Sequence, residues 1–324
     1  AHYVLEGTVR DVMAQGDFHA LQEQQVVQIA ASHIDAYTQK FMTSDLEEGR
    51  TGYLFRRNRE EVLKIVQNVA GELRVSSFAP CDEELAFAKD GTLPPVYVHT
   101  PDGQAVLTGF VDRVDILDTP GAKYFRVIDY KTGHKDFDYT DLLCGQGLQM
   151  LLYLFAIERA KTSHIAAGRK PAGVLYVPGR CDVERLEPGQ GEEKLAVLRK
   201  KHLQRQGVIL DDETVLQAME PGEKPAYLPY QIKKGERVGD LATPEQFRHL
   251  EEFVSNSLQS LTSQIYSGVV TPNPIVRGPM VSSCVYCEYQ DACHKDACKS
   301  ESRFIKKVSA EEFWNTLERR RHNG

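Results

Sequence analysis

A short segment near the middle of the chain places an acid and a lysine where they could act together on a phosphate ester. In VIDYKTG, residues 127–133, Asp129 and Lys131 are separated by one residue at the end of a β-branched run. Side chains two positions apart on a strand point to the same face of its sheet. The preceding strand-like run carries Asp112 in GFVDRVD, and the TPGA turn is expected to pair the two strands. We therefore expect Asp112, Asp129 and Lys131 to meet on one face.

Two carboxylates beside an ammonium would suit a divalent cation. Mg²⁺ prefers oxygen ligands and keeps several waters, so Asp112, Asp129 and the main-chain carbonyl of Tyr130 would be a sufficient cradle. A bound metal polarises a phosphodiester and helps to deprotonate water. Lys131 would stabilise the charge that develops in the transition state. The alternative is an exposed Asp–Lys ion pair, which contributes about 0–1 kcal/mol to stability.

Helical segments elsewhere could complete the site. Gln149 and Tyr153 are four residues apart in an apolar segment, so they share a helix face and could contact DNA or orient Lys131. His2 lies on an amphipathic N-terminal segment and could add an imidazole ligand. Taken alone, each of these favours an ordinary helix surface over a functional site. Glu84, on an earlier strand, is expected to be an outward-facing charge.

These residues must be positioned by a mixed sheet. Apolar residues at three- and four-residue spacing predict helices over most of residues 1–78. Strand-like runs follow, including one long run over 105–118 and another over 123–131, and predict an antiparallel meander. A helix from about 141 to 160 and a strand over 171–179 then predict a crossover.

The remaining segments complete an α/β fold. Residues 182–225 are charged and are expected to be helical, and 243–268 read as an amphipathic helix. The fold class is therefore α/β, with a mixed central β-sheet flanked by helices and a cysteine-rich C-terminal tail. The expected domains are a catalytic domain over 1–270 (helical 1–78, sheet and helices 79–270) and the tail over 271–324.

The tail contains most of the cysteines. Cys284, Cys287 and Cys293 have C-x2-C-x5-C spacing, and Cys298 is a candidate fourth ligand. The seven cysteines of the chain are an odd number and are unevenly spread, which does not indicate a disulfide framework. In a reducing compartment such a cluster binds metal, and both a [4Fe–4S] cluster and zinc need four ligands. Reduced core cysteines are the alternative.

The bulk composition excludes some classes of protein. The chain has 324 residues, 41% of them hydrophobic, and a net charge of -7. No apolar run is long enough to span a membrane, and the first residues resemble a helix rather than a signal peptide, so we expect a cytoplasmic protein. The acidic balance argues against an indiscriminate polyanion binder but leaves room for a local basic groove.

The motifs together resemble a known family, the RecB-type branch of the PD-(D/E)xK nucleases, which has a restriction-endonuclease-like core. The order is a histidine, then GxxD, DxK and QxxxY. The resemblance implies these metal ligands: His2, Asp112, Asp129 and the carbonyl of Tyr130. It implies these catalytic residues: Asp112, Asp129, Lys131, Gln149 and Tyr153.

The segments SSFAPCDEELAFAKDGTLPPVYV, LLCGQGLQMLLYL and PAGVLYV are similar to the C-terminal domain of AddB subunits of bacterial helicase–nucleases, over nearly the whole chain. This implies a Mg²⁺-dependent exodeoxyribonuclease, with Mn²⁺ as a possible substitute, that resects double-strand DNA ends for recombinational repair. Its implied partners are DNA single strands from unwound ends and an AddA-type subunit that supplies the motor. No G-x-x-x-x-G-K-[ST] motif occurs in the chain.

The same resemblance implies a [4Fe–4S] cluster held by Cys284, Cys287 and Cys293. The fourth cysteine of that family precedes the helix with the histidine, and here the sequence opens at Ala1, so we expect an incomplete cluster in this chain. Two alternatives are open at this point. One is a free-standing iron–sulfur exonuclease that acts on single-stranded DNA, and the other is a non-catalytic scaffold that binds DNA ends.

Overall fold

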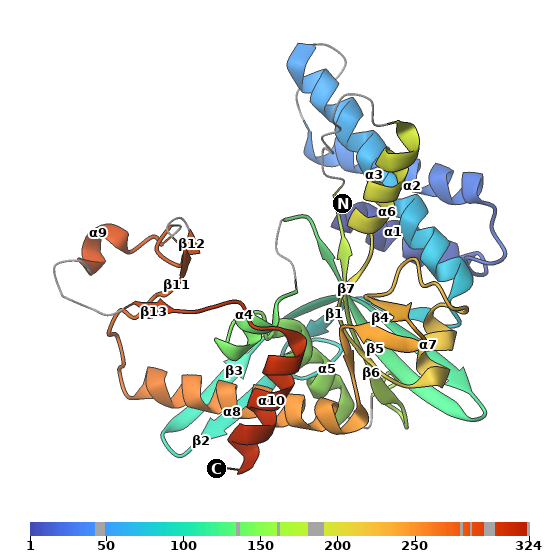
Figure 1. The fold of residues 1–324 in the computed structure, drawn as a ribbon. Coiled ribbons are helices and arrows are strands. Elements are labelled where there is room, and N and C mark those ends of the chain that lie inside the picture. The colour runs from blue at the N-terminus through green and yellow to red at the C-terminus, as the bar shows by residue number, and fades with distance from the viewer. Residues whose placement is uncertain are drawn as a thin grey trace. The chain divides into compact units, whose positions relative to one another are not determined.

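A computed structural model of the chain describes residues 1–42, 49–133, 137–160, 163–180, 191–278, 281–285, 287–294 and 302–322. The chain divides into two units, whose elements are labelled in Figure 1. Unit 1 comprises Ala1–Val96, Thr108–Phe137 and Gln149–Phe247. Unit 2 comprises Tyr97–Leu107, Asp138–Leu148 and Arg248–Gly324. The expected domain boundary at residue 270 stays a prediction.

Helices fill most of the first 75 residues, as the apolar spacing predicts. The helices of unit 1 are α1 (His2–Ala14), α2 (Glu23–Phe41), α3 (Gly49–Val75), α5 (Gln149–Arg159), α6 (Glu192–His202) and α7 (Glu213–Met219). On α2 the buried residues Val26, Ala30 and Ile34 are four apart and form one stripe. Helix α1 packs on α2, and α2 packs on α3, so the three helices gather beside the sheet (Figure 1).

The main sheet of unit 1 has six strands within the described residues, in the order β1-β4-β5-β6-β7-β10. These strands are β1 (Ala79–Phe87), β4 (Gly109–Thr119), β5 (Ala122–Lys131), β6 (Lys170–Pro178), β7 (Gln206–Leu210) and β10 (Leu241–Ala242). Strands β1, β4 and β5 pair antiparallel, and β5 pairs parallel with β6 across the α5 crossover. The predicted meander, crossover and mixed sheet are thus confirmed. A separate hairpin joins β8 (Tyr230–Lys233) to β9 (Glu236–Gly239).

The apolar sequence of β6 explains why this strand lies inside the sheet. Its residues Ala172, Val174, Leu175 and Val177 are at most 1% exposed. A strand that is covered on both faces reads as a continuous apolar run, and PAGVLYV is such a run. Apolar side chains of β5, among them Val127, likewise lie fully buried, so the strands that lead to the site stand in the core.

Three sequence expectations differ from the structure. The expected helix over 141–160 is two helices, because Gly145 and Gly147 between them adopt positive φ angles of 77° and 68°. The expected strand over 105–118 divides at Thr108 into β3 (Gly103–Leu107) and β4, which belong to different sheets. The segment 182–225 contains β7 as well as helices, since the buried run GVIL lies between charged residues.

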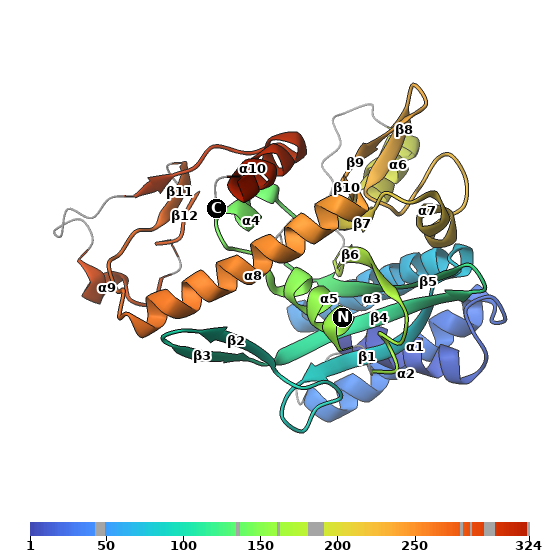
Figure 2. The same ribbon diagram turned by 90° about the horizontal axis from the view of Figure 1, so that it is seen from below.

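Unit 2 is built from shorter strands and from helices in separate stretches of sequence. Its strands are β2 (Val96–Thr100), β3 (Gly103–Leu107), β11 (Ile275–Gly278), β12 (Val281–Ser282) and β13 (Arg303–Phe304). Its helices are α4 (Tyr139–Leu143), α9 (Gln290–Cys293) and α10 (Ala310–His322), and α8 (Pro244–Tyr266) continues into it from unit 1. Helix α10 packs on α4, where the Tyr139 and Phe313 rings are 4.9 Å apart (Figure 2).

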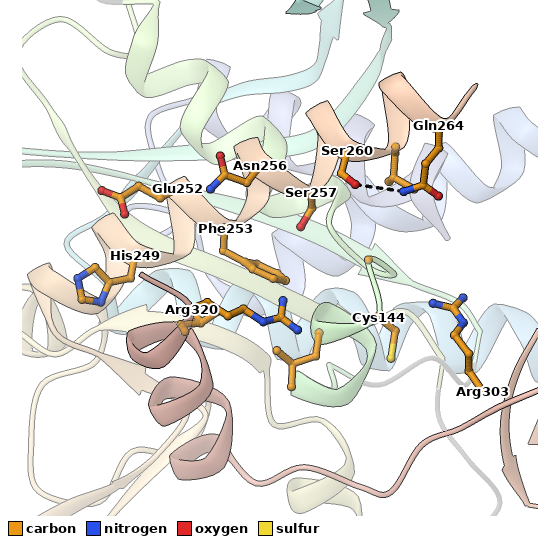
Figure 3. Close-up of a pocket in the computed structure, with 14 residues that line it drawn as sticks. Cys144, His249, Glu252, Phe253, Asn256, Ser257, Ser260, Gln264, Arg303 and Arg320 are labelled. Carbon is orange, nitrogen blue, oxygen red and sulfur yellow. Dashed lines mark hydrogen bonds between the residues drawn. The ribbon is translucent and has the colours of Figure 1, made fainter. Parts of the chain in front are cut away.

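A cavity of about 600 Å³ lies within unit 2. Its walls are the polar side of α8, the end of α10 and the segment after α4 (Figure 3). Arg320 lies over the Phe253 ring, with 5.7 Å between the guanidinium carbon and the ring centroid. Among the described helices of both units, none is long and apolar enough to cross a bilayer.

Candidate metal centre

The ends of β4 and β5 bring three of the expected residues together. The antiparallel register of these strands, continued by one residue, places Asp112 across from Asp129. Asp112 Oδ2 accepts a hydrogen bond of 2.7 Å from the main-chain N–H of Tyr130. Lys131 Nζ lies 2.6 Å from Asp129 Oδ2. The strand alternation that was read from the sequence therefore produces the expected placement of the two acids and the lysine.

The first turn of α1 adds an imidazole. His2 Nδ1 is 3.3 Å from Asp112 Oδ2, and its ring meets the ring of Tyr130 edge-on with centroids 6.0 Å apart. The hydrogen bond to Asp112 is the main cause that raises the pKa of His2 above its ordinary value. His2 remains 41% exposed, so one side of the imidazole is open to a ligand.

Glu84 joins this group, which the sequence interpretation did not expect. The pairs on either side of it in the β1–β4 register place it across from Asp112, and its φ angle is 50°. Ligand atoms of His2, Glu84 and Asp112 lie within 4.8 Å of one another, and no other such group of three is found among the described residues. Glu84 is exposed, as expected for an outward-facing charge, but its carboxylate lies beside His2 and Asp112.

The electrostatics of the group suit a cation. Burial raises the pKa of Glu84, and the neighbouring Asp112 and Glu6 raise it further. Like charges directly opposite each other on paired strands destabilise a sheet. Burial also raises the pKa of Asp129, while the bonded Lys131 opposes that shift. An imidazole and several carboxylates at this spacing are a donor set that fits Mg²⁺ or Mn²⁺.

Behind the site lies a network of buried charges. Arg113 Nε and Nη2 bond Asp115 at 2.8 and 3.1 Å, and Arg113 Nη1 donates a 2.6 Å bond to the Tyr130 hydroxyl. Arg126 Nε donates a 2.9 Å bond to Asp115 Oδ2, the oxygen that also accepts from Arg113 Nη2. Burial raises the pKa of Tyr130 to about 12 despite the nearby guanidinium, so the phenol stays protonated. Arg113 therefore fixes the residue that lies between Asp129 and Lys131.

The network continues to helix α3. Glu72 Oε1 is 3.0 Å from Arg126 Nη2, and Glu72 Oε2 is 2.7 Å from Arg205 Nη2. Burial alone would raise the pKa of Glu72, but the surrounding arginines outweigh it and lower the pKa to about 2. Sequence reasoning missed these residues because a charged residue on a strand normally indicates a solvent-exposed face. The one available signal was that GFVDRVD carries charges at adjacent positions, which alternation must direct to both faces.

Tyr153 packs beside the start of β4. Its ring stacks on Phe87, with centroids 4.8 Å apart and an interplanar angle of 16°. A Cβ atom on Gly109 would lie 1.8 Å from the Tyr153 hydroxyl, so the glycine of GxxD permits this close approach. The exposed Gln149 has its amide nitrogen 3.5 Å from the same hydroxyl, which is a weak contact. The expected roles of Gln149 and Tyr153 toward DNA or Lys131 stay predictions.

The tail cysteines lie in unit 2. Cys284 and Cys293 are half-buried, Cys287 is exposed, and all three are free thiols. Within the described ranges they do not form a group of three at the spacing found for His2, Glu84 and Asp112. Cys298 lies outside the described residues. The expected cluster ligands stay predictions.

Comparison with known proteins decides the family. The family model of the PD-(D/E)XK nuclease superfamily matches residues 1–294. The chain belongs to the PD-(D/E)XK nuclease superfamily. The segment Asp129-Tyr130-Lys131 has the D-x-K spacing that the family's description names, and the roles expected of Asp112, Asp129 and Lys131 stay predictions.

Curated relatives are named as one of the subunits of an ATP-dependent helicase/deoxyribonuclease. The protein of Clostridium novyi is 31% identical over 83% of this chain and 24% of its own length. That of Symbiobacterium thermophilum is 32% identical over 82% of this chain and 23% of its own length. That of Acetivibrio thermocellus is 29% identical over 88% of this chain and 26% of its own length. This nuclease-superfamily chain thus spans about a quarter of the relatives it matches.

Proposed function

We propose that this chain is the divalent-metal-dependent deoxyribonuclease domain of a helicase–nuclease that resects double-strand DNA ends for recombinational repair. The observation that carries the proposal is the convergence of His2, Asp112, Asp129 and Lys131 at the ends of α1, β4 and β5. The name borne by its relatives, a subunit of a helicase/deoxyribonuclease, supports the larger context.

The metal would be held by His2, Glu84 and Asp112, whose ligand atoms lie within 4.8 Å of one another, with Asp129 and the Tyr130 carbonyl on β5 as further oxygen donors. When bound, Mg²⁺ or Mn²⁺ supplies Lewis-acid polarisation of the phosphodiester. A cation would also favour the charged carboxylates, because burial and then the nearby Asp112 and Glu6 raise the pKa of Glu84. The mixture of imidazole and carboxylate favours Mn²⁺ as an effective substitute for Mg²⁺.

Lys131 would stabilise the transition state. Its ammonium is held by Asp129 Oδ2 at 2.6 Å and lies over the ring of Tyr176, 5.4 Å from the centroid. Burial raises the pKa of the Tyr176 phenol, and the charge of Asp129 raises it further, so the ring stays neutral beside the lysine. A positive charge that is fixed before reaction stabilises developing negative charge on phosphate oxygens without further reorganisation.

The context of this domain follows from the same relatives. We propose that its substrates are DNA single strands from unwound duplex ends, and that an AddA-type subunit supplies the motor. We also propose that Cys284, Cys287 and Cys293 bind three corners of a [4Fe–4S] cluster, because thiolates are the ligands of such clusters.

Digestion of end-labelled single-stranded DNA in Mg²⁺ tests the catalytic assignment. Asp129→Ala should reduce the cleavage rate at least about 100-fold, because it removes a ligand and the partner of Lys131. Asp118→Ala is the matched control, since this exposed acid on β4 pairs with Arg169 away from the group. Equal products from wild type and Asp129→Ala would contradict the proposal and leave a DNA-binding scaffold.

A further inference from the structure

An aromatic cluster lies beside His2 on the outer surface of α1 and α2. The centroids of the Tyr3 and Tyr37 rings are 5.3 Å apart, those of Tyr37 and Phe41 are 4.8 Å apart, and those of Tyr3 and Phe41 are 6.4 Å apart. We call these three residues the ring surface. Their exposed fractions are 36% for Tyr3, 41% for Tyr37 and 54% for Phe41. All three belong to unit 1.

The ring surface is not needed to build the core. Helix α2 buries Val26, Ala30 and Ile34, and the next positions on that stripe are Tyr37 and Phe41, which leave the core. The apolar stripe thus extends beyond the residues that pack against neighbouring helices. Adjoining exposed aromatic rings of this kind mark a contact surface rather than a packing requirement.

Charge near the rings suits a polyanion. Lys40 Nζ lies 5.0 Å from the centroid of the Phe41 ring. Three acids on the same two helices have cationic or imidazole partners: Asp11 bonds His33 at 2.8 Å, Asp35 bonds Arg59, and Glu6 pairs with Arg10. Asp11 and Asp35 are therefore each bound to another side chain rather than to Lys40.

The position of Tyr3 connects the ring surface to the metal centre. Tyr3 follows His2 directly in α1, and consecutive Cα atoms are about 3.8 Å apart. Nucleotides in a stacked strand are about 3.4 Å apart along its axis, so the rings begin within a few nucleotides of the metal centre. Single strands are bound without sequence preference by aromatic rings on which bases stack, together with cations that track the phosphates.

We infer that Tyr3, Tyr37 and Phe41 form a stacking platform for the bases of a single DNA strand next to the metal centre. Lys40 would contact a phosphate of the same strand. The inference deepens the proposed nuclease function by naming how an unpaired strand is held, and it rests on that function for the choice of DNA. The ligand class is single-stranded nucleic acid with intact bases.

The test measures binding without cleavage. A fluorescein-labelled oligothymidine strand is titrated with the wild-type chain in EDTA, so that binding is independent of the divalent metal. Base–aromatic stacking supports an expected loss of affinity of about tenfold for Tyr37→Ala or Phe41→Ala, and more for the double variant. Tyr37→Phe and Phe41→Tyr, which keep a ring, should bind as wild type does.

Two controls separate stacking from other causes. Phe304→Ala removes an 81% exposed ring in unit 2 and should leave affinity unchanged. An abasic strand of equal length keeps the phosphates, so the wild type should bind it more weakly and the ring variants should lose nothing further. Melting curves check that each variant is folded. If an alanine variant is not folded, Tyr37→Leu or Phe41→Leu, which keep an apolar side chain without a ring, give the same test.

The outcomes are distinguishable from failure of the nuclease proposal. If wild type does not cut DNA but Tyr37→Ala and Phe41→Ala still bind the strand more weakly than wild type does, the nuclease proposal fails and the platform stands. The platform is overturned if wild type and Tyr37→Ala/Phe41→Ala bind the strand equally. It is also overturned if the double variant changes only self-association in sedimentation, because the ring surface would then contact a second copy of the chain.

Discussion

The metal centre of unit 1 and the cysteine tail of unit 2 both present metal-ligating side chains, but they differ in what holds those side chains in place. In unit 1, Asp112 accepts a hydrogen bond from the main-chain N–H of Tyr130, and the Tyr130 hydroxyl is fixed by the fully buried Arg113. The strand residues that carry the ligands are therefore held in place by hydrogen bonds to groups inside the core. Such a site is arranged before a metal arrives.

The tail has no comparable support within the described residues. Cys284 follows the two-residue strand β12, and Cys293 ends α9, a helix of four residues with no buried member. Helices this short are not stable by themselves, because each first turn is costly to form. A metal bound by the tail would have to supply the ordering free energy itself. The comparison teaches that one site is organised by buried charge and the other would depend on its ligand.

The largest expected effect is the loss of Arg113. Arg113→Met would leave the Tyr130 hydroxyl without its partner and Asp115 with Arg126 alone, and breaking one member of a buried pair costs about 3–5 kcal/mol. Urea unfolding measures the change. Arg59→Met, which breaks a partly exposed pair with Asp35, is the control and should cost about 0–1 kcal/mol. A loss below about 1 kcal/mol for Arg113→Met would remove the distinction between the two regions.

The second-largest effect is expected in the stability of the fold at acid pH. The pKa of Glu72 is lowered in the fold from an ordinary 4.5 to about 2, so its stabilising effect is complete above pH 4.5 and is lost as the pH falls toward 2. The difference corresponds to about 3 kcal/mol in the free energy of unfolding. Glu72→Gln should flatten this part of the stability profile, measured by urea unfolding at several pH values.

Its control lies on the same helix. Glu61→Gln breaks an exposed pair with Arg57 and should keep the wild-type acid profile. If wild type and Glu72→Gln lose equal stability between pH 4.5 and 2, the buried network does not govern the acid response of unit 1.

The sequence was enough to predict the sheet order around the site. Alternation along β5 and the turn before it predicted that Asp129 and Lys131 share a face across from Asp112, and the register of β4 and β5 agrees, because side-chain direction on a strand is fixed by geometry. The roles of these residues stay predictions. The position of Glu84 was not predictable in the same way. Its side chain belongs to the group only because β1 pairs with β4, a contact between segments far apart in sequence.

The buried network could not be predicted for a different reason. A charged residue is normally exposed, and burial of Arg126 is tolerable because it pairs with two carboxylates, Asp115 of β4 and Glu72 of α3. Glu72 in turn pairs with Arg205 from the segment before β7. Each of these residues taken separately reads as a surface charge. Similarly, the break in the expected helix over 141–160 depends on two glycines that adopt positive φ angles. Tertiary structure determines whether glycines do so.

A smaller effect is expected at Gly109. Gly109→Ala would press a Cβ atom against the Tyr153 hydroxyl, and overpacking of this kind costs about 1–3 kcal/mol. Tyr153→Phe removes that oxygen, so the double variant should recover part of the loss in a double-mutant cycle measured by urea unfolding. Strictly additive losses would show that Tyr153 moves freely and that this end of β4 is not rigid. Gly121→Ala, at a position where a Cβ meets nothing within 4 Å, is the matched control.

The smallest effect is expected in the tail. Cys287 is exposed, so in protein freed of metal Cys287→Ser should change the free energy of unfolding by no more than about 0.5 kcal/mol. In protein purified anaerobically with iron, the same substitution should lower the bound iron and sulfide. It should also speed amide exchange in the tail more than in the main sheet, because the order would come from the bound cluster. Cys144→Ser, outside the C-x2-C-x5-C spacing, should leave iron content unchanged. A loss of more than about 1 kcal/mol in metal-free Cys287→Ser would mean that the tail holds itself together, and the two regions would then be organised alike.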